Sequence, residues 1–313
     1  MAQPSETFDT YDSIGEREDL SDVIYNISPT DTPFLSSAAK TQATAVLHEW
    51  QTDSLAAAVT NNAVIEGDEA TADAVTATTR LSNSSQILDK VVTITGTQEA
   101  VDKAGRASEI AYQIAKKAKE LKRDLESSLT SNNAEVTGSA SAARVLGGLG
   151  SWVATNDVFG SGGASGGLGN TARTNGTQRA FTEAQLKSVI KSVWNAGGNP
   201  QIIMVGPFNK QKLSGFTGNS TRFDAGADAT LYTSVDVYAS DFGQTQVIPN
   251  RFSRDRDAWV LDMDYWGVAF LRDFSMHELA KTGDTEKRQL LVECTLEARN
   301  EGASGLIADL TTS

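Results

Sequence analysis

Side chains suited to metal binding or acid–base chemistry are few in this sequence and lie far apart. The chain of 313 residues contains 2 histidines. His48 lies in a strand-like stretch, whereas His277 stands beside Glu278 in different surroundings. A zinc site needs three or four converging ligands, so either histidine would depend on carboxylates that folding brings to it. The spacing gives no metal-binding motif, and we expect no metal site.

Sequence signatures of nucleophilic catalysis and of nucleotide binding are also missing. Cys294 is the single cysteine, which excludes a disulfide framework, and no G-x-S-x-G nucleophile elbow is present. The glycines from Gly160 to Gly169 fit neither G-x-G-x-x-G nor a lysine-containing phosphate loop, so they predict a flexible surface loop. An aromatic cluster could line a pocket, although at strand spacing such residues more often form core. Its members are Trp259, Tyr265, Trp266, Phe270 and Phe274. We therefore expect no catalytic residue and no cofactor.

The composition restricts the class of protein and its partners. A chain of this length buries a sizeable core, in one large or two moderate domains. No basic stretch precedes an apolar one at the amino terminus, and no run approaches about 18 apolar residues, so we expect a soluble protein without a signal peptide or membrane span. The net charge of −13 at pH 7 disfavours tight duplex binding through phosphates. Any enclosed nucleic acid would be contacted loosely and without sequence specificity.

The negative charge is confined to the first third of the chain. Residues 1–102 contain 4 Lys and Arg against 17 Asp and Glu, whereas residues 103–313 contain 23 of each. Residues 41–79 contain no Lys or Arg, and their acidic side chains are Glu49, Asp53, Glu66, Asp68, Glu69 and Asp73. Such a span lacks the apolar area to build its own core. It must pair with itself as a hairpin or lie on a cationic surface, and an extended segment that needs a neighbour implies assembly.

Strand-like stretches flank the acidic span and predict a long two-stranded loop. Residues 43–55 lead outward, and residues 80–95 return with apolar side chains such as Leu88 and Val92. A dozen residues in each strand would project roughly 40 Å. An isolated ribbon of two strands is marginal in water, so we expect the loop to rest on a partner. The residues before it, 1–40, contain several turn formers and predict an arm that is pinned at a few points.

The longest helical pattern in the chain begins at Ser108 and extends to about Leu129. Apolar residues recur there at intervals of three and four, which places them on one face. The opposite face carries the densest basic run of the sequence: Lys116, Lys117, Lys119, Lys122 and Arg123. This run is either a solvated face, with pairs such as Lys122 to Glu126, or the counter-charge for an acidic loop that arrives from elsewhere.

The remainder of the chain predicts a mixed α+β fold. A capping box from Thr182 to Gln185 opens a helix that ends at Gly197. Short strands are predicted at residues 201–205, 231–239, 246–250, 259–261 and 266–271. A half-buried strand at 290–298 alternates apolar and charged residues and turns Cys294 inward.

A second group of basic residues follows residue 250. Arg251, Arg254 and Arg256 alternate there with Asp255 and Asp257. Such a mixed-charge cluster is either a solvated turn or an ion-pair patch between subunits.

Three stretches of sequence, together with the order of the predicted parts, carry a family resemblance. They are ISPTDTPF at 27–34, DFG at 241–243 with VIPNR at 247–251, and LAKTGDTEKR at 279–288 leading into ECTLEARN at 293–300. Over nearly the whole chain, the sequence resembles the major capsid proteins, or major head proteins, of tailed phages with the Hong Kong 97 type of fold.

The resemblance implies an α+β fold with five parts. These are an N-terminal arm at 1–40, an extended β-hairpin loop at 41–97, a peripheral domain with a long spine helix and the glycine-rich loop at 98–180, an axial domain at 181–250, and returning strands at 251–313 that complete the peripheral domain.

The resemblance also implies a structural and non-enzymatic role. The chain would self-assemble as hexamers and pentamers into the icosahedral capsid of a virion, enclose double-stranded DNA, and lay its extended loop over an adjacent subunit. Portal, scaffolding and decoration proteins would be further partners, and synthesis would take place in the host cytoplasm.

Two departures from the family pattern qualify this expectation. Some relatives crosslink a lysine of the loop tip to an asparagine, but residues 41–79 contain no lysine. We therefore expect non-covalent strengthening or a separate cement protein. No long helical scaffolding segment precedes the arm, so scaffolding is a separate protein or the chain is already mature.

Two other classes of protein stay open at this point. An encapsulin-like cellular compartment would use the same fold to enclose enzyme cargo, and particle images that show DNA and a portal vertex would separate a phage shell from it. The alternative of a different class is a soluble acidic α/β enzyme or binding protein that uses His277 or the aromatic cluster. That protein would elute as a monomer at all salt and protein concentrations.

Overall fold

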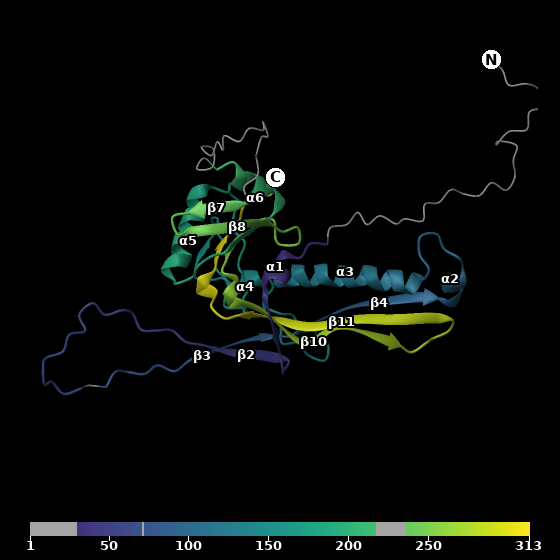
Figure 1. Cartoon of the computed structure of the whole chain (residues 1–313), viewed down its shortest axis with the longest axis horizontal. Coiled ribbons are helices and arrows are strands. Elements are labelled where there is room, and N and C mark those ends of the chain that lie inside the picture. The colour runs from purple at the N-terminus through teal and green to yellow at the C-terminus, as the bar shows by residue number, and fades with distance from the viewer. Residues whose placement is uncertain (1–29, 71, 217–235) are drawn as a thin grey trace, which may run out of the picture.

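A long helix on a long sheet dominates the structure, a computed structural model that is elongated in its described part (Figure 1). The residues that it describes are 30–70, 72–216 and 236–313. Helix α3 (Glu109–Leu129) lies along the sheet, and a more compact region that contains helix α5 (Glu183–Asn195) stands at one end of α3. From this same end, an extended loop points away from α3. Most of the predicted arm, residues 1–29, lies outside the described residues.

Four strands form the long sheet. Across the sheet they are β1 (Ala39–Gln42), β10 (Trp266–Leu279), β11 (Thr285–Ala298) and β4 (Gln86–Thr95). β1 is parallel to β10, and the other two pairs are antiparallel. The pairing of β10 with β11 shifts register between Phe270 and Ser275, whereas β4 follows β11 without a shift. The β10–β11 hairpin therefore carries the sheet along the whole length of α3.

The two-stranded part of the extended loop is shorter than predicted. β2 (Leu47–Thr52) pairs with β3 (Thr79–Ser84), but residues 86–95 do not return along the loop. They form β4 instead, because Val92 and Ile94 of that strand are buried beneath α3. Asn83 fixes the position where the chain leaves the loop and enters β4. Its side-chain amide donates to the carbonyl of Leu296 at 2.8 Å and accepts from the amide of Gly147 at 2.8 Å.

The predicted spine helix is confirmed. Ser108 is its N-cap, and the Ser108 hydroxyl accepts a hydrogen bond from the amide of Ala111, which satisfies one of the free donors of the first turn. The buried stripe is shorter than the sequence pattern, however. Leu121, Leu125 and Leu129 are fully buried, whereas the apolar residues of the first two turns are partly exposed. The core that covers Leu125 and Leu129 lies at the other end of the helix.

A second sheet forms the compact region beside the end of α3. Across this sheet its strands are β5 (Asp157–Val158), β12 (Gly305–Ile307), β9 (Ala258–Leu261), β6 (Ile202–Val205), β8 (Gly243–Pro249) and β7 (Val237–Ser240). The predicted capping box of α5 is present, and α5 packs on this sheet through Leu186, Val189, Ile190 and Val193. Helix α6 (Pro207–Ser214) follows β6. Residues 231–235 of the predicted strand 231–239 lie outside the described residues.

The carboxyl-terminal segment joins the two sheets. Residues 251–313, predicted to complete the peripheral domain, supply β10 and β11 to the long sheet but β9 and β12 to the second sheet. Short helical turns occupy the junctions: α1 (Pro33–Ser37), α2 (Gly96–Ala100), α4 (Leu149–Trp152), η2 (Met263–Tyr265) and η3 (Glu301–Ala303). The two sheets therefore share one continuous stretch of chain.

Two members of the predicted aromatic cluster belong to the hydrophobic core, as the strand spacing predicts. Trp259 and Trp266 are fully buried and pack with Phe34 and Trp152, while Phe274 is 39% exposed. Cys294 is buried as expected.

The predicted half-buried alternation of β11 is wrong for its second half, because residues 291–298 are buried on both faces. There Glu293 lies beneath Arg144 at 2.5 Å and Arg272 at 2.7 Å. Side chains from other elements thus cover the face of β11 that the alternation predicted to be exposed to solvent.

A buried carboxylate connects the arm, the spine helix and the second sheet. Glu126 of α3 is 0% exposed. Its oxygens accept from the amides of Phe34 (2.9 Å) and Leu35 (2.8 Å) and from the side-chain amide of Asn250 (2.7 Å), which follows β8. Thr32, the N-cap of α1, makes no side-chain cap, so Glu126 supplies the acceptors that the first turn of α1 needs. Burial raises the pKa of Glu126, and the three hydrogen bonds lower this pKa by less than burial raises it.

Replacing Glu126 by alanine is expected to lower the free energy of unfolding of the unassembled subunit by roughly 3 kcal/mol. Two buried amides and the side chain of Asn250 would lose their acceptor. Urea unfolding followed by tryptophan fluorescence measures the change. Ser127→Ala, at the exposed neighbouring position, is the control and should stay within about 0.5 kcal/mol of the parent. Equal stability of the two variants would contradict the role of Glu126.

Cys294 is expected to resist thiol reagents in the folded chain. Burial raises its pKa to about 12, so the reactive thiolate is scarce at pH 8. Labelling with a chromogenic disulfide should be absent in native protein and should reach one thiol per chain in denaturant. A Ser54→Cys variant places a cysteine at an exposed position and should react at once; native labelling of the parent at a comparable rate would refute the burial argument.

Candidate intersubunit surfaces

The root of the extended loop is fixed to the body of the subunit. Trp50 of β2 donates from its indole nitrogen to the carbonyl of Ala298 at 2.9 Å, and its ring lies 5.4 Å from that of Trp152. His48 lies 3.6 Å from Glu297, which also accepts from the hydroxyl of Thr41 at 2.9 Å. One of the two histidines thus serves as a contact at the base of the loop.

Beyond this root, the carboxylates of the acidic span form no ion pair within the described part of the chain. Asp53, Glu66, Asp68, Glu69 and Asp73 are all exposed, and none forms an ion pair with a described residue. Glu49 differs, because it lies 3.4 Å from Arg80 across the hairpin. Apolar side chains of the same span are 71% to 99% exposed: Leu55, Val59, Val64, Ile65 and Val75. As composition predicts, the span builds no core, and Figure 1 shows it extended away from the rest of the subunit.

The basic face of α3 is only partly free. Lys116 and Lys119 are exposed and form no ion pair with the described residues, whereas Lys117 pairs with Glu120 at 2.7 Å. Lys122 is exposed above the ring of Phe274 (5.9 Å) and Arg123 lies over that of Phe252 (5.0 Å). The possible pair of Lys122 with Glu126 is absent, because Glu126 points into the core. Three lysines, Lys116, Lys119 and Lys122, therefore remain available to another molecule.

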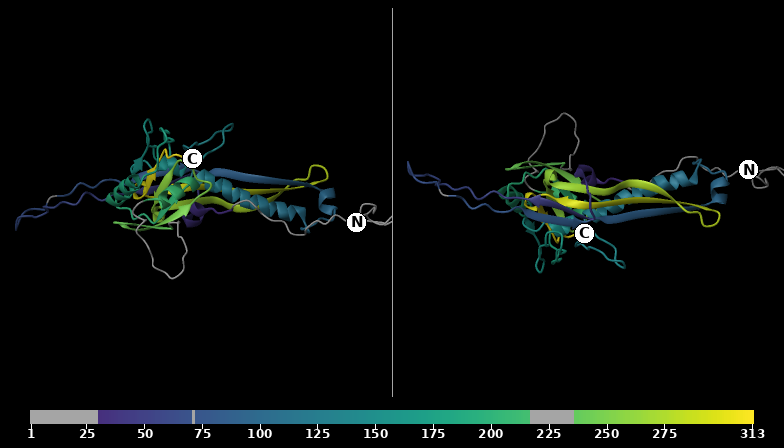
Figure 2. Two further views of the ribbon diagram at one scale, coloured as in Figure 1. Left: turned by 90° about the horizontal axis from the view of Figure 1, so that it is seen from above. Right: turned by 90° about the horizontal axis from the view of Figure 1, so that it is seen from below.

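The acidic loop and the lysines of α3 do not meet within one subunit. The loop leaves from the end of α3 that adjoins the second sheet and points away from the helix in every view (Figure 1 and Figure 2). Charge matching between the two surfaces therefore requires a second copy of the chain.

The arginines after residue 250 are used mainly inside the chain. Arg254 lies 3.2 Å from Asp257, and Arg173 donates to the other oxygen of Asp257 at 2.8 Å. Arg173 is also 3.7 Å from Asp309, which accepts from Arg256 at 2.6 Å. Arg173, Asp257 and Asp309 are fully buried. Arg254 and Arg256, predicted as intersubunit contact candidates, are thus held in an alternating network within the subunit. They stay candidates for a contact with a neighbour, as does the exposed Arg251.

The glycine-rich stretch is packed into this network rather than forming a flexible loop. Asp309, at a φ of 59°, accepts the amide of Gly160 at 3.0 Å. A Cβ at Gly160 would collide with the carbonyl of Thr177. Gly169 has a φ of +88°, and a Cβ there would meet the Trp152 ring at 2.7 Å. Glycine is needed at both positions because the chain passes too close to its neighbours for a side chain.

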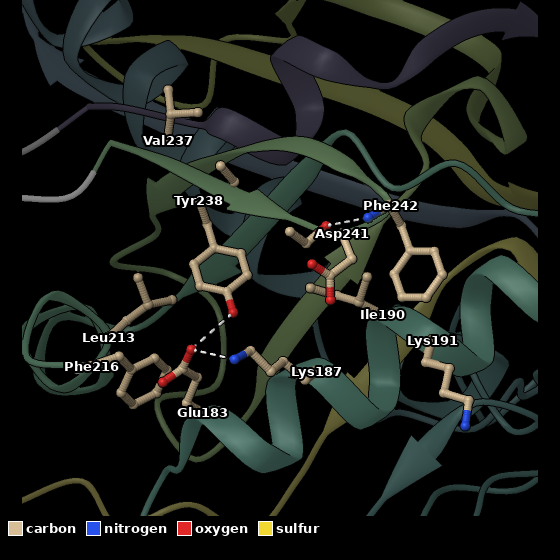
Figure 3. A pocket seen from close by; sticks show the side chains of 12 residues that line it. Glu183, Lys187, Ile190, Lys191, Leu213, Phe216, Val237, Tyr238, Asp241 and Phe242 are labelled. Atoms are coloured by element: carbon tan, nitrogen blue, oxygen red, sulfur yellow. Dashed lines mark hydrogen bonds and ion pairs between the residues drawn. The ribbon is translucent and has the colours of Figure 1, made fainter. Parts of the chain in front are cut away.

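A pocket of about 630 Å³ lies between α5 and the turn from β7 to β8. As Figure 3 shows, Glu183 accepts from the Tyr238 hydroxyl at 3.4 Å and pairs with Lys187 at 2.8 Å. The ring of Phe242 lines the pocket and stacks 5.2 Å from Trp194, which is 54% exposed. Two carboxylates line the pocket, and Glu183 is the one paired with a lysine, while Asp241 lies at the turn between β7 and β8.

The structure assembles no metal centre from the described residues. His277 is hydrogen bonded to Ser275 at 3.1 Å on β10, and His48 lies at the root of the loop. Within residues 30–70, 72–216 and 236–313, no group of three or more His, Cys, Asp or Glu side chains could hold a metal ion. In the same part of the chain, no helix combines the length and apolarity needed to span a membrane.

Solved structures with a similar fold include subunits of protein shells. The capsid subunit of cyanophage A-1(L) superposes with a TM-score of 0.65 at 14% identity and covers 97% of this chain and 99% of that one. The capsid protein of a native GTA particle gives 0.63 at 11% identity, over 96% and 97%. An encapsulin from Synechococcus elongatus gives 0.55 at 12% identity, over 96% and 94%. The chain thus has the α+β fold of Hong Kong 97-like shell proteins.

Sequence comparison then separates the phage capsids from the encapsulins. A model of the SU10 major capsid protein family matches residues 3–311. The major capsid protein of Escherichia phage Phieco32 is 30% identical, over 98% of this chain and 97% of that protein. The chain belongs to the SU10 major capsid protein family and is a major capsid protein of a tailed phage, which forms the shell by self-association.

Replacing Arg173 by methionine is expected to cost about 3–5 kcal/mol of subunit stability, because Asp257 and Asp309 would remain buried with less compensation. Urea unfolding of the unassembled chain measures this loss. Arg251→Met removes an exposed arginine and serves as the control, with an expected change below about 0.5 kcal/mol. If both variants unfold at the same urea concentration, the buried network does not hold the glycine-rich stretch.

Proposed function

We propose that the chain assembles as hexamers and pentamers into a closed icosahedral shell around double-stranded phage DNA. In this shell, the acidic extended loop of each subunit lies over the basic face of α3 in an adjacent subunit. The intersubunit contacts would come from Asp53, Glu66, Asp68, Glu69 and Asp73 on one side, and from Lys116, Lys119 and Lys122 on the other.

The unpaired acidic span carries the proposal. It exposes five carboxylates and five large apolar side chains, an arrangement that the described part of its own subunit does not stabilise. The free lysines lie on a different part of the chain, so each subunit offers both halves of the contact. An exposed ion pair is worth under about 1 kcal/mol, so the charges would set partner and register, while the apolar side chains and the repetition of the contact supply stability.

The remaining roles follow from the same surfaces. The chain acts as a structural subunit without chemistry of its own, made in the host cytoplasm and built into the virion together with portal and scaffolding proteins. DNA is contacted loosely, because a net charge of −13 leaves little attraction for phosphates. Strengthening is non-covalent or comes from a decoration protein, since residues 41–79 contain no lysine.

Reversing the acidic tip tests the charge matching. The triple variant Glu66→Lys, Asp68→Lys, Glu69→Lys should keep the thermal stability of the unassembled subunit, because these side chains make no ion pair with the described part of the chain. Its yield of closed particles at low salt should fall at least about tenfold, because like charges would face each other. Negative-stain electron microscopy and sedimentation of the assembly reaction measure the yield.

The matched control reverses Asp102, Asp241 and Asp264, which are exposed elsewhere, and carries the same net charge as the tip variant. A second variant adds Lys116→Glu, Lys119→Glu and Lys122→Glu to the reversed tip and should recover assembly, since the two surfaces are again opposite in sign. Normal assembly of the tip variant, or no recovery in the doubly reversed chain, would argue against the loop-on-helix contact.

A further inference from the structure

The free edge of β4 is the longest open sheet edge among the described residues. In the long sheet, β4 has 10 residues, whereas the other edge is formed by β1, with 4 residues, and then by residues 271–279 of β10, where the register on β11 is interrupted. In the second sheet, the edge strands β5 and β7 have 2 and 4 residues. Figure 2 shows β4 along one margin of the subunit, with β11 on its inner side. Ten residues at about 3.3 Å each present roughly 33 Å of strand edge.

β4 lacks most of the features that protect such an edge in other proteins, and its exposed charge, Asp89, accepts a hydrogen bond from Gln289 of β11 at 2.9 Å. Edge strands are commonly kept short or interrupted by proline, a bulge or a free lysine. The strand QILDKVVTIT contains no proline, its register on β11 is unbroken, and its one lysine, Lys90, is held by Asp124 at 2.6 Å. Ile87 and Val91 are each 46% exposed. An open edge of this length is a template for pairing with another chain.

Space for another strand exists beside this edge. A groove of about 530 Å³ runs between the second half of β4 and the first half of α3. Its walls include Val91 and Thr93 on the strand, and Glu109, Gln113 and Lys117 on the helix. Polar and apolar side chains both line the groove, and it runs along the open edge of β4, where an extended segment can bind through its main chain.

The returning limb of the extended loop, residues 72–78, has the matching properties. Its sequence ADAVTAT contains the β-branched residues Val75, Thr76 and Thr78, which favour strands, and Val75 is 96% exposed. In the described part of 53–78 the chain is extended and forms a single backbone hydrogen bond, from the amide of Asp68 to Ile65. The limb therefore has unused donors and acceptors, as β4 does along its free edge.

We propose that residues 72–78 of one subunit add as a strand to the free edge of β4 in a neighbouring subunit. This pairing rests on the proposed contact between loop and α3 and specifies its backbone part. With the limb on β4, the acidic tip at 66–69 lies about 10–20 Å beyond Ala72, three to six residues away, within the ~32 Å length of the adjoining α3. Main-chain hydrogen bonds are little affected by salt, whereas the exposed ion pairs are screened.

A proline scan of the limb tests strand addition directly. Proline is introduced singly at Asp73, Ala74, Val75, Thr76 and Ala77. Because only alternate amides of an added strand face its partner, replacements of one parity should reduce particle yield at least about tenfold, and those of the other parity should have little effect. Folding of the unassembled subunit is the control and should not change, because the limb is extended and exposed. Equal effects at all five positions, or no effect at any, overturn the proposal.

Disulfide trapping provides a second readout that does not depend on yield. Val91→Cys on β4 is combined with a cysteine at each of positions 73–77 in turn, and assembled particles are oxidised. Cys294 is buried and does not compete. Covalent oligomers of two or more chains should form at positions of one parity and only in particles, because each chain carries both cysteines. A flat proline scan and no parity in trapping, with the charge-reversal result intact, would reject strand addition and leave the loop-on-helix contact standing; failure of the charge reversal alone would do the opposite.

Discussion

The carboxylate of Glu126 is the interaction on which the arrangement of the subunit depends. It lies at the point where the arm, the spine helix and the second sheet meet, and it accepts one hydrogen bond from each of Phe34, Leu35 and Asn250. An ionised carboxylate in a fully buried position is unfavourable unless its lone pairs are occupied. Each of the three elements is therefore held in place by the same requirement. The large core around Trp152, Trp259 and Trp266 supplies most of the stability, but its apolar contacts have no direction, and the carboxylate fixes how the parts are oriented.

Charged side chains are paired in the interior of the subunit and are left unpaired on parts of its described surface. In the interior, Arg173, Asp257 and Asp309 alternate so that each buried charge faces an opposite one, and Glu293 is covered by two arginines. On the surface, the acidic loop and three lysines of α3 remain unpaired in the described structure. The interior network gives one rigid body, and the surface charges are complementary only between bodies. A soluble subunit that assembles on contact needs both, because an exposed apolar surface of the same area would also recruit wrong partners.

Local signals in the sequence predict the helices and strands, but they do not predict which elements pack against each other. Ser108 and the three-and-four spacing predict α3, and the capping box at Thr182 predicts α5, because both patterns act within a few residues. The sequence of residues 86–95 predicts a strand, but no local sequence signal indicates that this strand leaves the loop and pairs with β11. Glu126 directly follows Leu125 and lies three residues before Leu129, which places it at the border of the buried stripe. This position is the signal in the sequence for the burial of Glu126. Arg173 lies in a polar stretch, TARTNG, and gives no such signal. The isolation of the acidic span was predictable from composition, since residues 41–79 contain no cation.

The positions of the two complementary surfaces also constrain the geometry of assembly. The loop and the α3–β4 surface are different parts of the chain and lie toward opposite ends of the subunit, so a contact between them is head-to-tail rather than two-fold. Head-to-tail contacts close into rings when the rotation between neighbours divides a full turn, and otherwise give open filaments. In the proposed shell, rings of five and six copies differ only by a small rotation at each contact. A long loop fixed at Trp50 and free beyond Thr52 tolerates such a rotation, because the residues that reach the neighbour are separated from the root by extended chain. The same feature that leaves the loop without support in one subunit therefore lets a single sequence form both kinds of ring.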